Sequence, residues 1–199
     1  MPNRLLQFLS LVLFIFLLTG CKEYKPLETD ESFCTRTCIQ KFESTDLNIR
    51  LRYPDGWGHS TQPGLVTLFY HGLKDSQEVI RSFIYFIDEH KADEDEMLSG
   101  YQKNIDFRVT EIKKQYADSA TFTLEENNGI KFADKKWETM GLTYEVTVQG
   151  KKTTYTESYY LADIGKKSLV IKVVVEGQSD LSVINAEIDC ILSKVEFID

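Results

Sequence analysis

The sequence predicts an α+β fold, in which an antiparallel sheet of about six or seven strands is flanked by helices in an αβα sandwich. Segments that alternate apolar and polar residues, or that are apolar throughout, recur along the chain between turn residues, as they do in a sheet. Two further segments place apolar residues three and four positions apart, which is the spacing of a helix that covers a sheet.

The clearest strand pattern lies in residues 47–53, where Leu47, Ile49, Leu51 and Tyr53 alternate with polar residues. Further strands are expected at residues 65–70, 82–87, 121–125, 142–148, 153–161 and 168–175. The segments 65–70 and 82–87 are apolar on both faces, so we expect them to be covered on both sides. The nearly all-apolar segment 168–175 predicts the centre of the sheet.

A helix is predicted after residue 93 from a stripe of apolar residues, namely Leu98, Tyr101, Ile105, Val109, Ile112 and Tyr116. Asp93 can cap its first turn, with Glu96 at the capping-box position, although Gly100 weakens the helix. The acidic run at residues 88–96 favours the positive end of this helix and lacks the glycine of a calcium-binding loop.

The first 20 residues are expected to be a bacterial signal peptide. Residues 5–18 are apolar except for Gln7 and Ser10, a run too short to span a bilayer as a helix but suited to the core of a secretory signal. The run ends in Leu18-Thr19-Gly20-Cys21, which resembles the lipobox of bacterial lipoproteins. The resemblance implies diacylglycerol on Cys21 and cleavage before it. An ordinary signal peptide or a short anchor helix is the alternative.

After Cys21 we expect a lipid-anchored tether at residues 21–36 and a single α+β domain at residues 37–199. Residues 22–32 are polar and include Pro26, as in a linker. The predicted location is the bacterial cell envelope, with acyl chains in the membrane and the domain facing the periplasm or the exterior. Lys22, in place of an Asp after Cys21, favours the outer membrane where the organism has one.

A second resemblance is carried by residues 47–57, where a strand runs into Tyr53-Pro54-Asp55-Gly56-Trp57. This looks like the opening of the PsbP/DcrB-like superfamily, in which a helix at mid-chain, a long antiparallel meander and a closing helix follow. The similar element order covers residues 37–198. It implies an accessory, assembly or binding protein without shared catalytic residues. The residues themselves indicate a structural turn, because Pro54 fixes φ, Gly56 can take a positive φ and Trp57 can cover the end of the sheet.

No motif in the sequence identifies an enzyme, a metal site or a cofactor. The three histidines, His59, His71 and His90, do not have metal-ligand spacing, and no phosphate-binding loop or nucleophile elbow occurs. A hydrolase built on His59 or His71 is a hypothesis without an orienting carboxylate, although Ser60 follows His59. The net charge of −8 disfavours nucleic acid as a partner.

Tyrosines gather in residues 153–161, and two interpretations stay open. Exposed Tyr155, Tyr159 and Tyr160 could bind a partner protein or a glycan, since tyrosine combines apolar area with a hydroxyl. Strand alternation instead places Tyr155, Tyr159 and Leu161 on one face, which favours a place in the core.

Three cysteines besides Cys21 predict a disulfide. A closing helix capped by Ser179 or Asp180 is expected from the apolar residues Leu181, Ile184, Ile188, Leu192 and Val195. Cys190 lies roughly opposite this stripe, where a free thiol would be open to oxidation. We therefore expect the N-terminal segment to cross this helix and Cys34 or Cys38 to bond Cys190. Pairing of Cys34 with Cys38 is the alternative.

Together these features predict a lipid-anchored, non-enzymatic accessory protein that binds a protein partner or supports assembly at the membrane. Anchoring confines the domain to a surface and raises its effective concentration for partners there. The alternative is a carrier of a small ligand or glycan with a pocket between sheet and helix. A large dry pocket would favour the carrier, and a flat exposed aromatic surface would favour the partner-binding protein.

Overall fold

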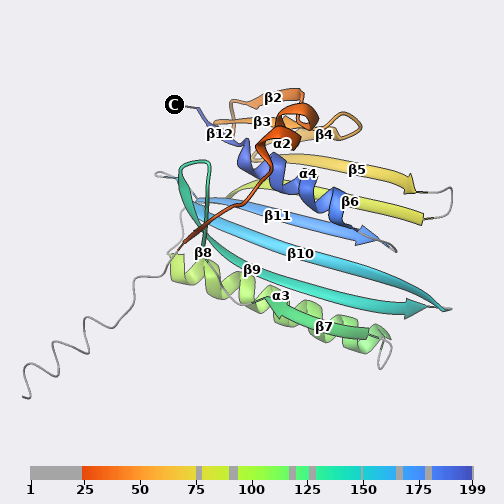
Figure 1. Cartoon of the computed structure of the whole chain (residues 1–199). Helices are drawn as coiled ribbons and strands as arrows, with labels where there is room; N and C mark the ends of the chain where they lie inside the picture. Colours follow the sequence, from red (N-terminus) through yellow and green to blue (C-terminus); the bar gives the residue numbers. More distant parts are fainter. Residues whose placement is uncertain are drawn as a thin grey trace, which may run out of the picture.

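The computed structural model describes residues 24–74, 78–89, 94–116, 120–125, 129–148, 150–164, 168–177 and 181–198. A nine-stranded sheet forms the body of the molecule (Figure 1). Its strands are β1 (Lys25–Pro26), β4 (Gly58–Gln62), β5 (Leu65–Lys74), β6 (Glu78–Glu89), β7 (Ala120–Glu125), β8 (Gly129–Phe132), β9 (Lys135–Val148), β10 (Lys151–Asp163) and β11 (Ser168–Gly177). Their order is β1-β8-β9-β10-β11-β6-β5-β4, and β7 pairs with β9 beside this path.

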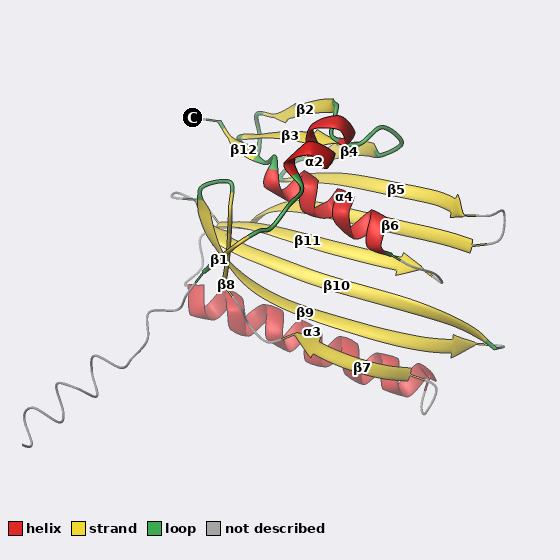
Figure 2. Cartoon of the chain, viewed as in Figure 1, coloured by secondary structure: helices red, strands yellow, loops and turns green. Residues whose placement is uncertain are grey.

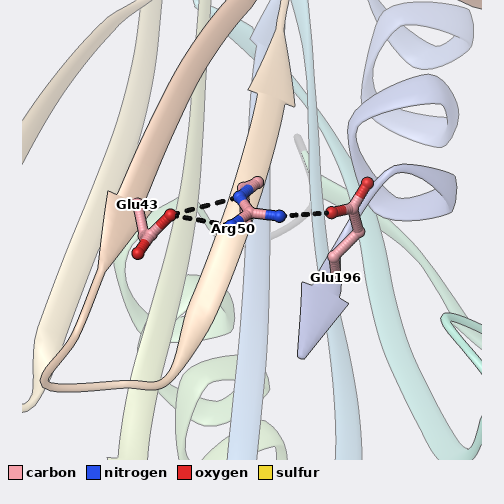
Figure 3. A network of polar contacts seen from close by, with 3 residues as sticks. All are labelled: Glu43, Arg50 and Glu196. Carbon is pink, nitrogen blue, oxygen red and sulfur yellow. Dashed lines mark hydrogen bonds and ion pairs between the residues drawn. The ribbon is translucent and has the colours of Figure 1, made fainter. Parts of the chain in front are cut away.

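A smaller sheet, in the order β12-β3-β2, contains β2 (Gln40–Ser44), β3 (Ile49–Tyr53) and β12 (Glu196–Phe197). On its surface Arg50 of β3 binds Glu43 of β2 at 3.0 Å and Glu196 of β12 at 3.1 Å (Figure 3). The charged network therefore joins all three strands of the small sheet. The helices are α2 (Glu31–Thr37), α3 (Glu94–Tyr116) and α4 (Ser182–Ser193).

The predicted α+β class is confirmed, and β11 occupies the expected central position between β10 and β6. The expected six or seven strands were too few, and the expected purely antiparallel pairing is wrong because β1 runs parallel to β8. The missed strands are short and have no long alternation. The turn between β8 and β9 was not predicted. Its two positive φ angles are taken by Ala133 and Asp134, whereas Asn-Gly is the usual sequence signal of such a hairpin.

The helices α4 and α3 lie on opposite sides of the main sheet (Figure 2), and each covers an apolar layer. On one face α4 buries Ile184, Ile188 and Leu192 against strand residues such as Ile84 and Ile171. On the other face α3 packs along β7 and β9. The expected sandwich of helices around a sheet is therefore present. None of the helices in the described part of the chain is long and apolar enough to cross a bilayer.

Residues 24–36 lie within the segment expected to be a tether, residues 21–36, and form a short strand and a short helix that pack on the domain. β1 pairs with β8 through Lys25 and Pro26. α2 begins after Asp30, whose carboxylate accepts a hydrogen bond from the Phe33 amide at 3.0 Å. The polar composition of this segment suggested a linker. A two-residue strand and a seven-residue helix, however, need few apolar side chains to pack on the domain.

The start of α4 differs from the sequence expectation. The helix begins at Ser182 with Leu181 as its N-cap residue, and Leu181 offers no side-chain hydrogen bond. The expected caps, Ser179 and Asp180, lie outside the described residues, as does Asp93 before α3. The apolar stripe itself is confirmed, because Ile184, Ile188 and Leu192 are all buried.

Replacing Gly100 by alanine is expected to raise the free energy of unfolding by about 0.5–1 kcal/mol. Gly100 lies inside α3, and a Cβ added there would meet no atom within 4 Å. The gain comes from the lower backbone entropy of alanine in the unfolded chain. Urea unfolding of the two proteins measures the difference, and Gly72→Ala is the matched control. There a Cβ would fall 2.1 Å from the Tyr70 hydroxyl and should destabilise the fold.

Candidate functional site

The α3 face of the main sheet is covered on only part of its width. The α3 helix buries Ile105 and Ile112 against β9 and β10, on residues such as Leu142 and Leu161. On the same face α3 contacts only the end of β6, where the Tyr101 hydroxyl donates to Glu89 at 2.8 Å, and among the described residues its main contacts are with β7 and β9 (Figure 2). The prediction that residues 65–70 and 82–87 are covered on both sides is therefore wrong for this face, because α3 follows β7 and β9 rather than the middle of the sheet.

Three aromatic side chains occupy this uncovered area, and we call Phe69, Phe83 and Tyr85 the aromatic sheet face. Phe69 and Phe83 lie directly opposite each other on β5 and β6. The rings of Phe83 and Tyr85 stack with centroids 6.0 Å apart. Phe69 is 39% exposed, and the other two are half-buried. A run of apolar residues suggested a buried strand here, and the sequence contains no signal that one of its faces is open.

The edge strand β4 shapes this surface through Gly58, which pairs with Phe69. A Cβ added to Gly58 would fall 2.5 Å from carbons of the Phe69 ring. The ring therefore lies over bare backbone, and any side chain at position 58 would displace it. The absence of a side chain extends the aromatic sheet face towards the edge of the sheet.

A charged group, the Glu157 cluster, lies beside the aromatic sheet face and consists of Glu157, Lys172, Arg108 and Tyr159. Arg108 of α3 contacts one carboxylate oxygen of Glu157 at 2.9 Å, and Lys172 of β11 contacts the other at 3.1 Å. The Tyr159 hydroxyl donates to Glu157 at 3.2 Å. Lys172 is also the cross-strand neighbour of Tyr85, so cluster and aromatic sheet face adjoin.

All three charged members of the Glu157 cluster are held in their ionised forms. Burial opposes the charged form of Glu157, but the attraction of Lys172 and Arg108 outweighs it and lowers the pKa of the carboxyl. Burial also opposes the charge on Lys172, yet Tyr159 and Glu157 raise its pKa. Two cations around one anion leave an excess of one positive charge. The cluster was not predicted, although the sequence contains two signals for it: Glu157 shares a strand face with Tyr159 and Leu161, and Lys172 interrupts an apolar run.

The tyrosines of β10 lie mainly in the core, as strand alternation favoured. Tyr159 is buried, and Tyr155 stacks on Tyr144 with ring centroids 4.8 Å apart. Burial raises the pKa of Tyr144 to about 12. Tyr160 lies on the opposite face, edge-on to Phe132. These rings therefore serve packing beneath α3 and α4 and leave little surface for a ligand.

The turn at Tyr53, Pro54, Gly56 and Trp57 takes the structural form that its residues indicate. Gly56 has a φ of +93°. Tyr53 and Trp57 are buried, and the Trp57 indole N–H donates to Glu187 of α4 at 2.8 Å. The Trp57 ring also packs on Tyr70, with centroids 5.8 Å apart. The turn thus ties the small sheet to α4 and to β5.

In the described part of the chain, neither His59 nor His71 has the hydrogen-bonded serine and carboxylate that the hydrolase hypothesis requires. The Nδ1 atom of His59 lies 2.9 Å from the Tyr53 hydroxyl, and its ring packs on Phe42 at 4.5 Å. His71 is exposed on β5, opposite Arg81. His90 lies outside the described residues. Within the described part of the chain, no three His, Cys, Asp or Glu side chains are grouped as metal ligands.

The structure pairs Cys34 with Cys190, with the Cα atoms 5.1 Å apart across a separation of 156 residues. This is one of the two pairings expected to Cys190, and the alternative Cys34–Cys38 bond is not formed. Cys190 does face away from the apolar stripe of α4. It is nevertheless buried, because α2 lies against α4 on that side. Cys38 is a free, buried thiol one helical turn from Cys34.

Cys38 is expected to react with iodoacetamide at pH 8 on the order of 100-fold more slowly than an exposed thiol of ordinary pKa. Burial, and next the nearby charge of Glu187, raise the pKa of Cys38 to about 11, so little thiolate is present. Mass spectrometry of peptides alkylated before and after addition of urea gives the rate. Rapid labelling of Cys38 in the native protein, or any labelling of Cys190 before reduction, would contradict this arrangement.

A groove of about 400 Å³ lies between the small sheet and β4, lined by Phe42, Glu43, Ser44, Thr45, Asp46, Thr61, Gln62 and Pro63. Most of these side chains are polar, and the groove is open to solvent. It is therefore neither the dry pocket nor the sheet-to-helix position that a carrier was expected to have.

Comparisons with known proteins give only distant similarities in structure. No protein-family model and no curated protein matches the sequence. LpqN, involved in cell envelope biogenesis of Mycobacterium tuberculosis, is 12% identical, with a TM-score of 0.46 over 86% of this chain and 98% of its own. PsbP of the cyanobacterium Synechocystis is 12% identical, with a TM-score of 0.44 over 79% of this chain and 91% of its own. The Ran-binding protein Mog1p of Saccharomyces cerevisiae is 10% identical, with a TM-score of 0.44 over 80% of this chain and 95% of its own.

Proposed function

We propose that the chain is a lipid-anchored, non-enzymatic accessory protein of a bacterial cell envelope that binds a protein partner through the aromatic sheet face. The observation that carries the binding role is the uncovered pair of strands with Phe69, Phe83 and Tyr85 on their surface. Aromatic side chains are enriched at the centres of protein interfaces, and polar and charged groups lie mainly around them at the rim. The neighbouring Glu157 cluster, with its excess positive charge, favours a partner whose contacting surface is acidic.

The anchor is proposed on the four residues Leu18-Thr19-Gly20-Cys21 after an apolar run. Mass spectrometry of the protein from native membranes is expected to show a chain that starts at Cys21 and carries acyl groups. Cys21→Ser should abolish acylation, whereas Cys38→Ser should retain it. An intact Met1, or an unmodified Cys21 at the mature start, would refute the anchor.

The partner surface is tested by a photo-crosslinking amino acid placed at position 69 and, as control, at position 183. Val183 is 64% exposed on α4, more than the 39% of Phe69, so chance encounters favour the control position. One discrete crosslinked species from position 69, lost with Tyr85→Ala and absent from position 183, is expected. Equal crosslinking from both positions would refute a specific surface.

A further inference from the structure

We infer that the corner formed by β1, β8 and β9 rests on anionic lipid headgroups of the membrane to which the chain is anchored, through the basic corner Lys25, Lys131, Lys135 and Lys136. This inference rests on the proposed acylation of Cys21 and adds an orientation to it. The corner is basic within an acidic protein: residues 129–137 hold three lysines and one acid, Asp134, in a chain of net charge −8.

The placement of the basic corner follows from the pairing of β1. Residues 22–24 are all that separates Cys21 from β1, and a fully extended chain covers at most about 3.6 Å per residue. Lys25 therefore stays within roughly 15 Å of the lipidated sulfur. Because β1 pairs with β8 and β8 pairs with β9, Lys131 of β8 and Lys136 of β9 lie at this same corner.

The lysines are arranged in a way that costs stability in the isolated protein. Lys131 and Lys136 lie directly opposite each other on β8 and β9, where like charges repel. Among the described residues, none of the four lysines of the basic corner forms an ion pair. The Lys136 ammonium lies 5.2 Å from the ring centre of Tyr24, and Lys135 lies 5.4 Å from that of Phe197. These contacts orient the side chains without neutralising them, which leaves their charge for an external anion.

Acids also lie near this corner, among them Glu28, Asp134 and Glu138. Glu138 is buried and accepts a hydrogen bond from the Tyr24 hydroxyl. Asp134 lies in the turn between β8 and β9 and is exposed. Each lysine near an anionic bilayer surface adds about 1 kcal/mol of attraction. Four lysines at the point where the anchor enters are therefore sufficient to set which side of the domain faces the lipid.

Lysine footprinting tests the inference on the mature acylated protein bound to vesicles. The protein is added to vesicles of phosphatidylcholine alone, or of equal parts phosphatidylcholine and phosphatidylglycerol, and lysines are acetylated and measured by mass spectrometry. On the anionic vesicles, labelling of Lys131 and Lys136 is expected to fall about fivefold. Lys151 is the control, since it is exposed at the start of β10, opposite the far end of β9 and about 40 Å from Lys136 at the rise of a strand.

Lys131→Glu is a second test. It reverses one charge of the basic corner and should not destabilise the fold, because Lys136 then has an opposite charge across the strands. This variant should lose the protection of Lys25 and Lys136, whereas Lys151→Glu should keep it. Flotation separates the two proposals. A protein that does not float with phosphatidylcholine vesicles has no anchor. One that floats but shows equal labelling of Lys131 on both vesicle types has an anchor and refutes the docking corner.

Discussion

Replacing Cys34 and Cys190 together by alanine is expected to lower the free energy of unfolding by about 4–5 kcal/mol, the value of the chain-entropy model for loops of more than 100 residues. The bond closes a loop across 156 residues, so its loss enlarges the unfolded ensemble greatly. For a chain of this size the melting temperature should fall by roughly 10–20 °C. Urea unfolding with and without reductant measures the change.

Cys38→Ala is the matched control for this prediction, because it removes a buried sulfur of the same helix and leaves the bond intact. We expect it to cost no more than about 1 kcal/mol, as for loss of a small buried side chain that leaves a small cavity. Reductant should lower the urea midpoint of the wild type and of Cys38→Ala, and leave that of the double variant unchanged. An unchanged wild-type midpoint under reductant would contradict the pairing.

The disulfide also decides how the anchor acts on the domain. α2 has seven residues, fewer than an isolated helix needs for stability, and β1 has two. The bond to Cys190 holds α2 on α4 and thereby keeps β1 near β8. Without it, residues 22–39 could serve as a long tether, and the basic corner would lose its fixed distance from the lipid. The footprint of Lys131 should therefore weaken in the double alanine variant.

Long apolar patterns in the sequence were sufficient to predict the long strands and helices. Short strands and tertiary contacts could not be predicted from it. The apolar run of β11 indicated a central strand, and the stripe of α4 indicated that Cys190 needed a cover. By contrast, β8 was missed because its turn residues, Ala133 and Asp134, carry no usual hairpin signature. Local propensity cannot reveal which half of a sheet face a helix covers.

The aromatic sheet face shows this limit most directly. Phe69 and Phe83 have the same residue type as Phe86, but Phe86 is buried in the layer under α4, whereas Phe69 and Phe83 lie on the face that α3 covers only in part. That Glu157 has a charged partner could have been predicted from the sequence, since a charged residue on an apolar strand face needs one. Its partners, Arg108 and Lys172, are 49 and 15 residues away. The register of β10 and β11 places Lys172 near Glu157, and the packing of α3 on the sheet places Arg108 there.

The Glu157 cluster should respond strongly to loss of its carboxylate. Glu157→Gln keeps the shape of the side chain but leaves Lys172 and Arg108 facing each other without an anion. We expect a loss of about 2–3 kcal/mol at pH 7, below the 3–5 kcal/mol typical of fully buried pairs. The expected loss is smaller because the side chain of Arg108 is 47% exposed and therefore screened by water, whereas that of Glu157 is 5% exposed. Urea unfolding of the two proteins gives the difference.

The pH dependence of this difference distinguishes electrostatics from packing. The pKa of Glu157 is lowered in the folded protein, so its stabilising effect is complete above the unfolded-state pKa of about 4.3 and is lost as the pH falls through the folded value. Glutamine does not titrate. The gap between wild type and Glu157→Gln should therefore be constant from pH 7 to about pH 5 and shrink below about pH 4.

Glu43→Gln is the exposed counterpart, since Glu43 also binds an arginine but lies on the surface of the small sheet (Figure 3). Exposed ion pairs contribute about 0–1 kcal/mol, so this variant should change little at any pH. Equal effects of the two substitutions, or a gap for Glu157→Gln that persists unchanged at pH 3, would show that the carboxylate acts through packing. In that case the excess positive charge beside Tyr85 would not be a fixed property of the surface proposed to bind an acidic partner.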